Sequence, residues 1–331
     1  MAAPPTVLVT GASGFIGGRL AVALRQRGYR VRAHFRPGDD AGALERAGVE
    51  CFASDICDRD SLERAARGCE GVFHVAGNVS FRRRDRALQR RVNVEGTRAV
   101  LAACRRAGVR RLVHTSTVNT LGPARPAGAL ADEDTLFDPR GCGLHYAETK
   151  KQAEDLALAA GRDGLEVVVV HPGTVFGPGD RFANAGSYIL AIARLPVLLS
   201  PAGGTNCVHV DTVVEGHIAA FERGRAGQRY ILGGQNLRYR EIFATIAAAL
   251  GKPAPIATLP TWLAAPAAAV LERLFDRLGI EANLSAEAAR AGGMLLYYSS
   301  ARAERELGLR PLPFSRAVRE AVDWYRREGR I

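Results

Sequence analysis

The chain has 331 residues, of which 47% are hydrophobic and 24% are charged. That balance is typical of a folded globular protein and excludes disordered and collagen-like sequences. At roughly 100–200 residues per domain, the length predicts one large or two moderate domains. The first residues lack a basic segment followed by an apolar one, so we expect no signal peptide. No apolar run reaches the roughly 18 residues of a membrane span.

The net charge is +11, and lysine occurs only at positions 150, 151 and 252, so nearly all basic residues are arginines. Proteins that bind nucleic acid or a membrane surface gather their basic residues in one stripe. Here the arginines are spread along the chain, which is typical of solvated helix faces. We therefore expect no nucleic-acid partner, no stable membrane insertion, and a small molecule as the ligand.

The cysteines show neither a C-x-x-C pattern nor a histidine at a zinc-binding interval, which excludes a disulfide scaffold and a structural zinc site. We expect no metal, histidines that are packed rather than metal-bound at positions 74 and 209, and a cytoplasmic location. The six cysteines are Cys51, Cys57, Cys69, Cys104, Cys142 and Cys207.

Short β-branched runs alternate with amphipathic stretches in the first half of the chain. Continuous apolar strands separated by helices predict parallel strands covered on both faces, which is the doubly wound α/β plan. The predicted strands are Val7–Val9, Tyr29–Phe35, Val49–Phe52, Gly71–Val75, Arg111–His114 and Val167–Val170, and the predicted helices are Phe15–Arg27, Ser61–Gly68 and Glu95–Ala107.

After about residue 175 the pattern changes to shorter strands and Ala-rich helices, predicted at Arg238–Leu250, Thr261–Leu278 and Arg316–Arg327. We interpret residues 176–331 as a smaller, partly helical region that closes over the site, with a short part that returns to the first sheet. The apolar stretch Leu259–Leu278 is interpreted as core or as the roof of an apolar pocket, with membrane-surface docking as a minor alternative.

A glycine pattern follows the first predicted strand at once and opens a helix. Gly11 permits a sharp turn, Gly14 lets the backbone approach a diphosphate, and Gly17 lets helix and strand pack closely. Free N–H groups at the start of the helix then bind the phosphates. This arrangement predicts a dinucleotide site, and the intervening residues Ser13, Phe15 and Ile16 belong to it.

The end of the second predicted strand bears on the choice of cofactor. NAD is favoured by a carboxylate there, which bonds the ribose 2′-OH. The strand instead ends at Arg36, whose guanidinium suits the 2′-phosphate of NADP. We predict NADP, with NAD as the alternative, and take Asp39 and Asp40 as turn residues. Asp55-Ile56 is placed to meet the adenine ring, unless Asp55 caps a helix.

Tyr146 and Lys150 lie one helical turn apart on the same predicted face. A phenol is a poor proton donor at neutral pH unless its phenolate is stabilised. A neighbouring ammonium, together with the positive nicotinamide ring of an oxidised cofactor, supplies that stabilisation. The pair can exchange a proton with a carbonyl or alcohol oxygen while hydride moves at the adjacent carbon. Ser116 and Thr117, at the end of the fifth predicted strand, supply hydroxyls that can hold the substrate oxygen.

With these motifs together, the chain resembles the extended short-chain dehydrogenases/reductases, which have the Rossmann fold. Within them it resembles the branch of dihydroflavonol-reductase-like and aldehyde-reductase-like proteins, and in that branch it is most similar to the hopanoid-associated sugar epimerases. The motifs that carry the resemblance are Thr10-Gly-Ala-Ser-Gly-Phe-Ile-Gly17, Phe73-His-Val-Ala76, Asn93-Val-Glu-Gly-Thr97, Thr115-Ser-Thr117, Tyr146-Ala-Glu-Thr-Lys150, His171-Pro-Gly-Thr-Val-Phe-Gly-Pro178, Val208-His-Val-Asp211, Gly227–Asn236 and Ala321–Arg326.

The resemblance implies a division into an NADP-binding domain, residues 1–175, and a substrate-binding region, residues 176–331. It implies that Tyr146 is the acid/base, that Lys150 also bonds the nicotinamide ribose, and that Thr117, with Ser116 as the alternative, is the catalytic hydroxyl. It further implies a homodimer through helices at 87–106 and 144–160. The remaining cofactor contacts are assigned to Val75, Ala76, Gly77, Thr115, His171, Gly173 and Thr174.

Three activities are compatible with this reading. A reductase that uses NADPH on a ketone, aldehyde or secondary alcohol is favoured, because Thr205-Asn206-Cys207 stands where related nucleotide-sugar epimerases carry an arginine for the diphosphate. Epimerisation of a sugar or nucleotide sugar is the second possibility, and an NADP-sensing protein without turnover is the third. Ser80 and Phe81, after the fourth predicted strand, are expected at the substrate mouth.

Overall fold

The computed structural model describes residues 4–124, 126, 129–137, 144–278 and 286–331. Cys142 lies outside the described residues. The five cysteines within them are free thiols: Cys51, Cys57, Cys69, Cys104 and Cys207.

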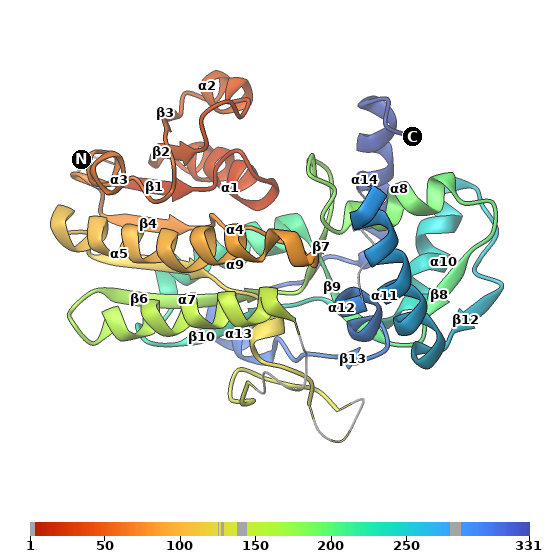
Figure 1. The fold of residues 1–331 in the computed structure, drawn as a ribbon. Helices are drawn as coiled ribbons and strands as arrows, with labels where there is room; N and C mark the ends of the chain where they lie inside the picture. Colours follow the sequence, from red (N-terminus) through yellow and green to blue (C-terminus); the bar gives the residue numbers. More distant parts are fainter. Residues whose placement is uncertain (1–3, 125, 127–128, 138–143, 279–285) are drawn as a thin grey trace.

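A seven-stranded sheet forms the centre of the molecule (Figure 1), with its strands in the order β10-β6-β5-β4-β1-β2-β3. Every neighbouring pair is parallel. The six strands predicted in the first half are confirmed, and the seventh comes from the second half of the chain. The strands are β1 (Thr6–Thr10), β2 (Arg30–Phe35), β3 (Glu50–Ala53), β4 (Gly71–His74), β5 (Arg111–Thr115), β6 (Glu166–Pro172) and β10 (Arg229–Leu232).

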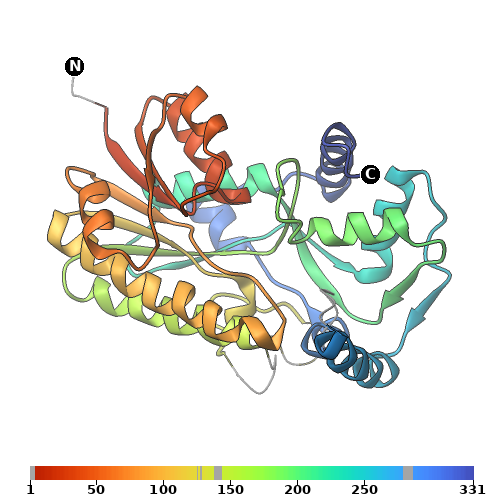
Figure 2. The same ribbon diagram turned by 45° about the horizontal axis from the view of Figure 1, so that its top comes forward.

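Helices cover both faces of this sheet (Figure 2), as continuous apolar strands require. One layer contains α3, α5 and α7, and the other contains α1, α9 and α13. A short helix, α2, that the sequence pattern did not predict lies between β2 and β3. The helices of this part of the structure are α1 (Phe15–Gln26), α2 (Gly42–Arg46), α3 (Arg59–Ala66), α4 (Arg86–Arg90), α5 (Gly96–Ala107), α7 (His145–Gly161), α9 (Val210–Arg223) and α13 (Ala301–Leu307).

The rest of the chain forms a smaller region beside the carboxyl ends of the strands (Figure 1). It has a sheet in the order β11-β9-β13, with β7 also paired to β9, and a separate pair β12-β8. Its elements are β7 (Thr174–Phe176), α8 (Gly186–Arg194), β8 (Leu199–Pro201), β9 (Gly204–His209), β11 (Gln235–Arg238), α10 (Tyr239–Leu250), β12 (Ala257–Leu259), α11 (Thr261–Leu278), α12 (Ala286–Ala291), β13 (Leu295–Leu296) and α14 (Phe314–Arg327).

The chain reverses its direction of travel across the sheet between β1 and β4, which are neighbours although β2 and β3 come between them in sequence. Ligands of doubly wound sheets bind at such a reversal, beside the carboxyl ends of the strands. The glycine turn follows β1, the segment Val75–Gly77 follows β4, and the hydroxyl-rich segment follows β5. The sheet order therefore brings three predicted site segments to one edge.

The helix α11 does not bury its apolar residues as core. Ala268 is only 3% exposed, but Trp262 is 77% exposed and Val270 is 64% exposed. The interpretation of this stretch as core is therefore wrong for its outward face, because one side of the helix packs on α12 and nothing among the described residues covers the other. In the described part of the chain no helix is both long and apolar enough to cross a membrane.

Gly71, in the central strand β4, has no room for a side chain. A Cβ there would lie 2.1 Å from Cε2 of Phe221 on α9. We expect Gly71→Ala to lower the free energy of unfolding by about 1–3 kcal/mol, because the ring and the strand must move apart. Urea unfolding measures the change. The matched control is Gly161→Ala, whose Cβ would be 3.6 Å from Val167. Equal stability of the two variants would contradict the expectation.

Candidate active site

The turn between β1 and α1 is shaped to accept an anion. Gly11 has φ +69°, and a Cβ on it would lie 2.7 Å from the Ala76 backbone, while a Cβ on Gly17 would lie 2.3 Å from the Gly11 carbonyl oxygen. Gly14 is the N-cap of α1, with no side-chain cap and no acidic residue in the first turn. The first-turn N–H groups, which include those of Phe15 and Ile16, are therefore available to a diphosphate.

The end of β2 meets this turn through a carboxylate. Asp39 accepts a hydrogen bond from the Ser13 hydroxyl at 2.6 Å and pairs with Arg36 at 3.2 Å. Its neighbour Asp40 accepts from the Gly42 backbone at 2.9 Å and pairs with Arg181 at 2.8 Å. Asp39 is thus more than the turn residue that the sequence predicts, because its side chain joins the two cofactor segments.

The predicted adenine-side pair follows β3. Asp55 accepts from the Cys57 backbone at 2.8 Å and from Arg91 at 2.8 Å. The helix-cap alternative for Asp55 is wrong, since Asp58 is the N-cap of α3. Ile56 is 7% exposed and lies under Gly96, where a Cβ would come within 2.9 Å of it.

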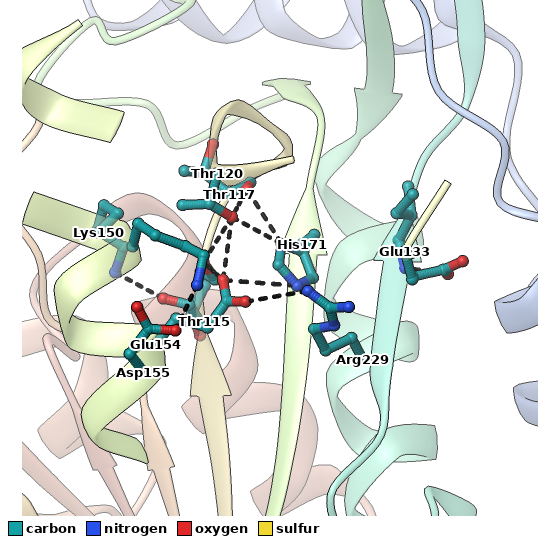
Figure 3. Close-up of polar contacts among 12 residues, drawn as sticks. Thr115, Thr117, Thr120, Glu133, Lys150, Glu154, Asp155, His171 and Arg229 are labelled. Atoms are coloured by element: carbon teal, nitrogen blue, oxygen red, sulfur yellow. Dashed lines mark hydrogen bonds and ion pairs between the residues drawn. The ribbon is translucent and has the colours of Figure 1, made fainter. Parts of the chain in front are cut away.

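The candidate catalytic side chains meet where α7 begins beside the end of β5. The Lys150 ammonium donates to the Thr115 carbonyl oxygen at 2.6 Å (Figure 3). One turn earlier, the Tyr146 hydroxyl lies near the Thr117 hydroxyl, and both side chains are largely buried, at 8% and 7% exposure. The structure therefore brings three of the predicted residues, Thr117, Tyr146 and Lys150, to one edge of the sheet.

Burial sets the protonation of Tyr146 and Lys150 in opposite directions. Burial raises the pKa of Tyr146 to about 12, and the neighbouring Thr117 hydroxyl opposes this shift. Burial lowers the pKa of Lys150 to about 8, and Glu154 opposes that shift. Desolvation is the largest influence on the phenol, and the Lys150 ammonium is bonded to the Thr115 carbonyl oxygen.

Behind these residues lies a buried polar network that the sequence did not reveal (Figure 3). Glu154, 0% exposed, accepts from Ser116 at 2.7 Å and from Thr120 at 3.0 Å. His171 lies 3.7 Å from Glu154 and contacts the Thr117 carbonyl oxygen at 3.1 Å. Ser116 and the His171 side chain therefore serve this network, and Thr117 is left as the hydroxyl beside Tyr146.

A π-helical turn, Arg91–Glu95, interrupts the passage from α4 to α5 and positions Asn93. The Asn93 amide donates to the Asn78 carbonyl and to Thr149, at 3.1 and 3.0 Å, and accepts from the Asn78 N–H at 2.8 Å. A Cβ on Gly77 would lie 3.5 Å from Asn93 Oδ1 and 3.6 Å from Lys150 Nζ. A side chain at position 77 would thus fill the space beside Lys150, where the predicted ribose would bind.

The predicted substrate mouth follows β4. Phe81 lies edge-to-face against Tyr146, with 6.1 Å between ring centroids. Ser80 donates to Asp85 at 2.6 Å, and Arg82 pairs with the same carboxylate at 2.9 Å. Phe81 therefore contacts the candidate acid/base directly, whereas the Ser80 hydroxyl is engaged in its own loop.

The segment after β6 packs against β9. Thr174 is hydrogen-bonded to Thr205 at 3.0 Å, and a Cβ on Gly173 would lie 2.6 Å from Asn206 Oδ1. Asn206 is fully buried and accepts from the Gly234 N–H at 2.9 Å. The position expected to clamp a sugar-nucleotide diphosphate is therefore occupied by a structural amide.

Two buried or half-buried histidines have structural partners. His74 is held between Thr10 and Thr97 at 2.8 and 2.9 Å, which confirms it as a packed strand-end residue. In the described part of the chain, His209, Asp211 and Glu320 are near enough to hold a metal ion. His209 caps α9, however, and the carboxylates pair with Arg19 and Arg316, so these groups already have partners.

Comparison with known proteins places this geometry in a family. The family model described as "NAD dependent epimerase/dehydratase family" matches residues 7–233. The chain belongs to this family. Among its relatives is the sterol demethylase protein B of Methylococcus capsulatus, 36% identical over 338 residues, with 98% of this chain and 100% of that protein covered. Another is the dihydroflavonol 4-reductase of Zea mays, 33% identical, with 73% of each chain covered.

Among solved structures, the UDP-glucose 4-epimerase of Thermus thermophilus in complex with NAD superposes with a TM-score of 0.77 and 26% identity, over 97% of this chain and 99% of that one. Family membership makes the chain an NAD(P)-dependent enzyme with a Rossmann-like fold. The sequence-based identification as an extended short-chain dehydrogenase/reductase with dihydroflavonol-reductase-like relatives is confirmed.

The glycine turn, the uncapped start of α1 and the lack of a side chain at Gly77, next to Lys150, fit a dinucleotide. Sequence reasoning missed Asp39, Glu154 and the amide role of Asn93. Asn93 belongs to a motif that carried the resemblance, so its position could have been found. Glu154 carried a weaker signal, a carboxylate one turn after Lys150 on the buried face of a helix.

Glu154 should contribute to stability in a pH-dependent manner. Burial acts to raise its pKa, but His171 and the Ser116 hydroxyl outweigh burial, so the pKa is lowered from 4.5. A lowered carboxyl pKa stabilises the fold above the unfolded-state value, and the gain disappears as pH falls through the folded value. We expect Glu154→Gln to lower the free energy of unfolding by about 1–3 kcal/mol at pH 7. The difference in unfolding free energy between the variant and the wild type should narrow below about pH 4.5.

Urea unfolding at several pH values measures this difference. Glu148→Gln, on the same helix with a side chain that is 43% exposed, is the matched control and should change little. A difference for Glu154→Gln that stays constant from neutral to acidic pH would contradict the expectation.

Proposed function

We propose that the chain is an NADPH-dependent oxidoreductase that reduces a ketone or aldehyde, or oxidises the corresponding secondary alcohol. The observation that carries the proposal is the buried cluster of Thr117, Tyr146 and Lys150. It lies at the carboxyl ends of the strands, on the side of the sheet where the strand order reverses. The dihydroflavonol 4-reductase among the relatives supports a reductase. NADP rather than NAD rests on Arg36, which follows β2 and suits a phosphate.

In this proposal the chain's residues hold the substrate oxygen and move its proton. The dinucleotide supplies hydride to the carbonyl carbon or takes it from the alcohol. Thr117 and Tyr146 bond the oxygen, and Tyr146, fully protonated at neutral pH given its pKa of about 12, donates a proton as negative charge develops there. Lys150 provides positive charge beside the forming phenolate, and Phe81 covers the ring of Tyr146 from the substrate side.

The first functional test removes the phenol. Tyr146→Phe should lower turnover about 10²–10⁴-fold and leave NADPH affinity nearly unchanged, because only the proton donor is lost. The assay follows NADPH consumption with a panel of ketones and aldehydes. Tyr29→Phe is the matched control, since that hydroxyl bonds Glu222 at 3.0 Å on the far side of the sheet. An undiminished rate for Tyr146→Phe would remove this residue from the mechanism.

The pH dependence tests Lys150. Because the pKa of Lys150 is about 8, most of its side chains are charged below pH 8 and most are neutral above it. We expect kcat/KM for reduction to be level at neutral pH and to fall as pH rises through about 8. Lys150→Arg retains its charge and should keep a level profile. A wild-type profile still level beyond about pH 9 would contradict a role for this ammonium.

Epimerisation of a sugar remains the alternative, since a UDP-glucose 4-epimerase has the same fold. The buried Asn206, in place of a diphosphate-binding arginine, favours the reductase. Purified protein that retains NAD and converts a sugar without net NADPH consumption would support the epimerase. NADPH binding without turnover on any carbonyl tested would support the third possibility, a cofactor-sensing protein.

We further propose a cytoplasmic homodimer. It forms through the outer faces of α5 and α7, which pack side by side and present a shallow groove lined by Leu101, Ala102 and Leu156, among others. Sedimentation at micromolar concentration should give twice the mass of the chain, and Leu101→Arg should give the monomer. A wild-type protein that is monomeric at this concentration would contradict the dimer.

A further inference from the structure

The protein itself places an anion, the carboxylate of Asp39, beside the predicted cofactor site. Asp39, with its side chain 17% exposed, uses both carboxylate oxygens. Oδ1 accepts from Arg36 Nη2 at 3.2 Å, and Oδ2 accepts from Arg36 Nε at 3.3 Å and from the Ser13 hydroxyl at 2.6 Å. The carboxylate is therefore held by a guanidinium fork and a hydroxyl at once.

The same donors are those that a phosphate would use. A guanidinium binds a phosphate through two parallel N–H bonds, and a hydroxyl adds a third. Ser13 lies in the glycine turn and Arg36 directly after β2, so both border the place of the adenosine ribose in a doubly wound sheet. Asp39 thus already accepts the hydrogen bonds that the 2′-phosphate of NADP would need from Arg36 and Ser13.

NADP and NAD would interact differently with the Asp39 carboxylate. A 2′-phosphate must displace the carboxylate from Arg36 and Ser13 and then remain close to a like charge, which weakens its binding. A ribose 2′-OH can donate to the carboxylate where it stands, as in sites that bind NAD. An arginine after β2, read alone, therefore overstates the preference for NADP.

We propose that Asp39 determines the ratio of NADP to NAD affinity, by acting as an internal competitor of the 2′-phosphate for Arg36 and Ser13. The proposal rests on the proposed dinucleotide-dependent function and deepens it. Asp39 weakens, without abolishing, the preference for NADP that Arg36 gives the site.

The neighbouring carboxylate offers a matched control. Asp40 carries the same charge one residue later, but it pairs with Arg181 at 2.8 Å and its side chain is 64% exposed. It contacts neither Ser13 nor Arg36 in the structure as described. Neutralising Asp40 changes the net charge as neutralising Asp39 does, and it leaves the donors of the phosphate site engaged.

The experiment measures dissociation constants for NADPH, NADH, 2′,5′-ADP and 5′-AMP by calorimetry, on the full chain and its variants Asp39→Asn, Asp39→Ser and Asp40→Asn. We expect both Asp39 variants to bind NADPH and 2′,5′-ADP about tenfold or more tightly than the wild type, by removal of a like charge. Affinity for NADH and 5′-AMP should stay equal or fall. Asp40→Asn should change the NADPH/NADH ratio by no more than about twofold.

The result that overturns the proposal is a NADPH/NADH affinity ratio that changes equally in the Asp39 and Asp40 variants, or not at all. Arg36→Ala provides a second check, because it should weaken NADPH and 2′,5′-ADP selectively. Unchanged NADPH binding in Arg36→Ala would also overturn it. Failure of the proposed function would look different: the wild type would bind dinucleotides with the expected pattern and transfer no hydride to any substrate.

Discussion

The hydrogen bond from the Lys150 ammonium to the Thr115 carbonyl oxygen is the contact on which the site depends. It fixes the second turn of α7 to the carboxyl end of β5, and both residues are buried. One turn before Lys150, the helix then presents Tyr146 to Thr117. The geometry of the candidate site follows from the helical repeat once this one bond is made.

A buried ammonium needs compensation, and the structure supplies it from the same helix. Glu154 follows Lys150 by one turn, is likewise buried, and acts to hold the lysine pKa up against desolvation. Glu154 in turn accepts hydrogen bonds from Ser116 and Thr120, and His171 lies beside its carboxylate. A buried charge is tolerated only when polar partners surround it, and hydrogen bonds to Glu154 tie the segment after β5 to α7.

Much of this arrangement could be predicted from the sequence, and the failures share a cause. The strands, the glycine turn and the Tyr-Lys spacing are local patterns, and the structure contains each of them. Asp39 and Glu154 were missed as site residues because their partners, Ser13 and His171, are distant in sequence. The raised pKa of Tyr146 was missed as well, since burial depends on what packs around the phenol.

The sequence by itself determined the α/β class, the first six strands of the central sheet, the glycine turn and the candidate residues for proton transfer. The tertiary structure alone decided which carboxylate engages Arg36 and which segment of the second half, β10, returns to the central sheet. The reason is physical. Backbone periodicity and turn chemistry act between near neighbours in the chain, whereas desolvation and ion pairing act between groups that only folding brings together.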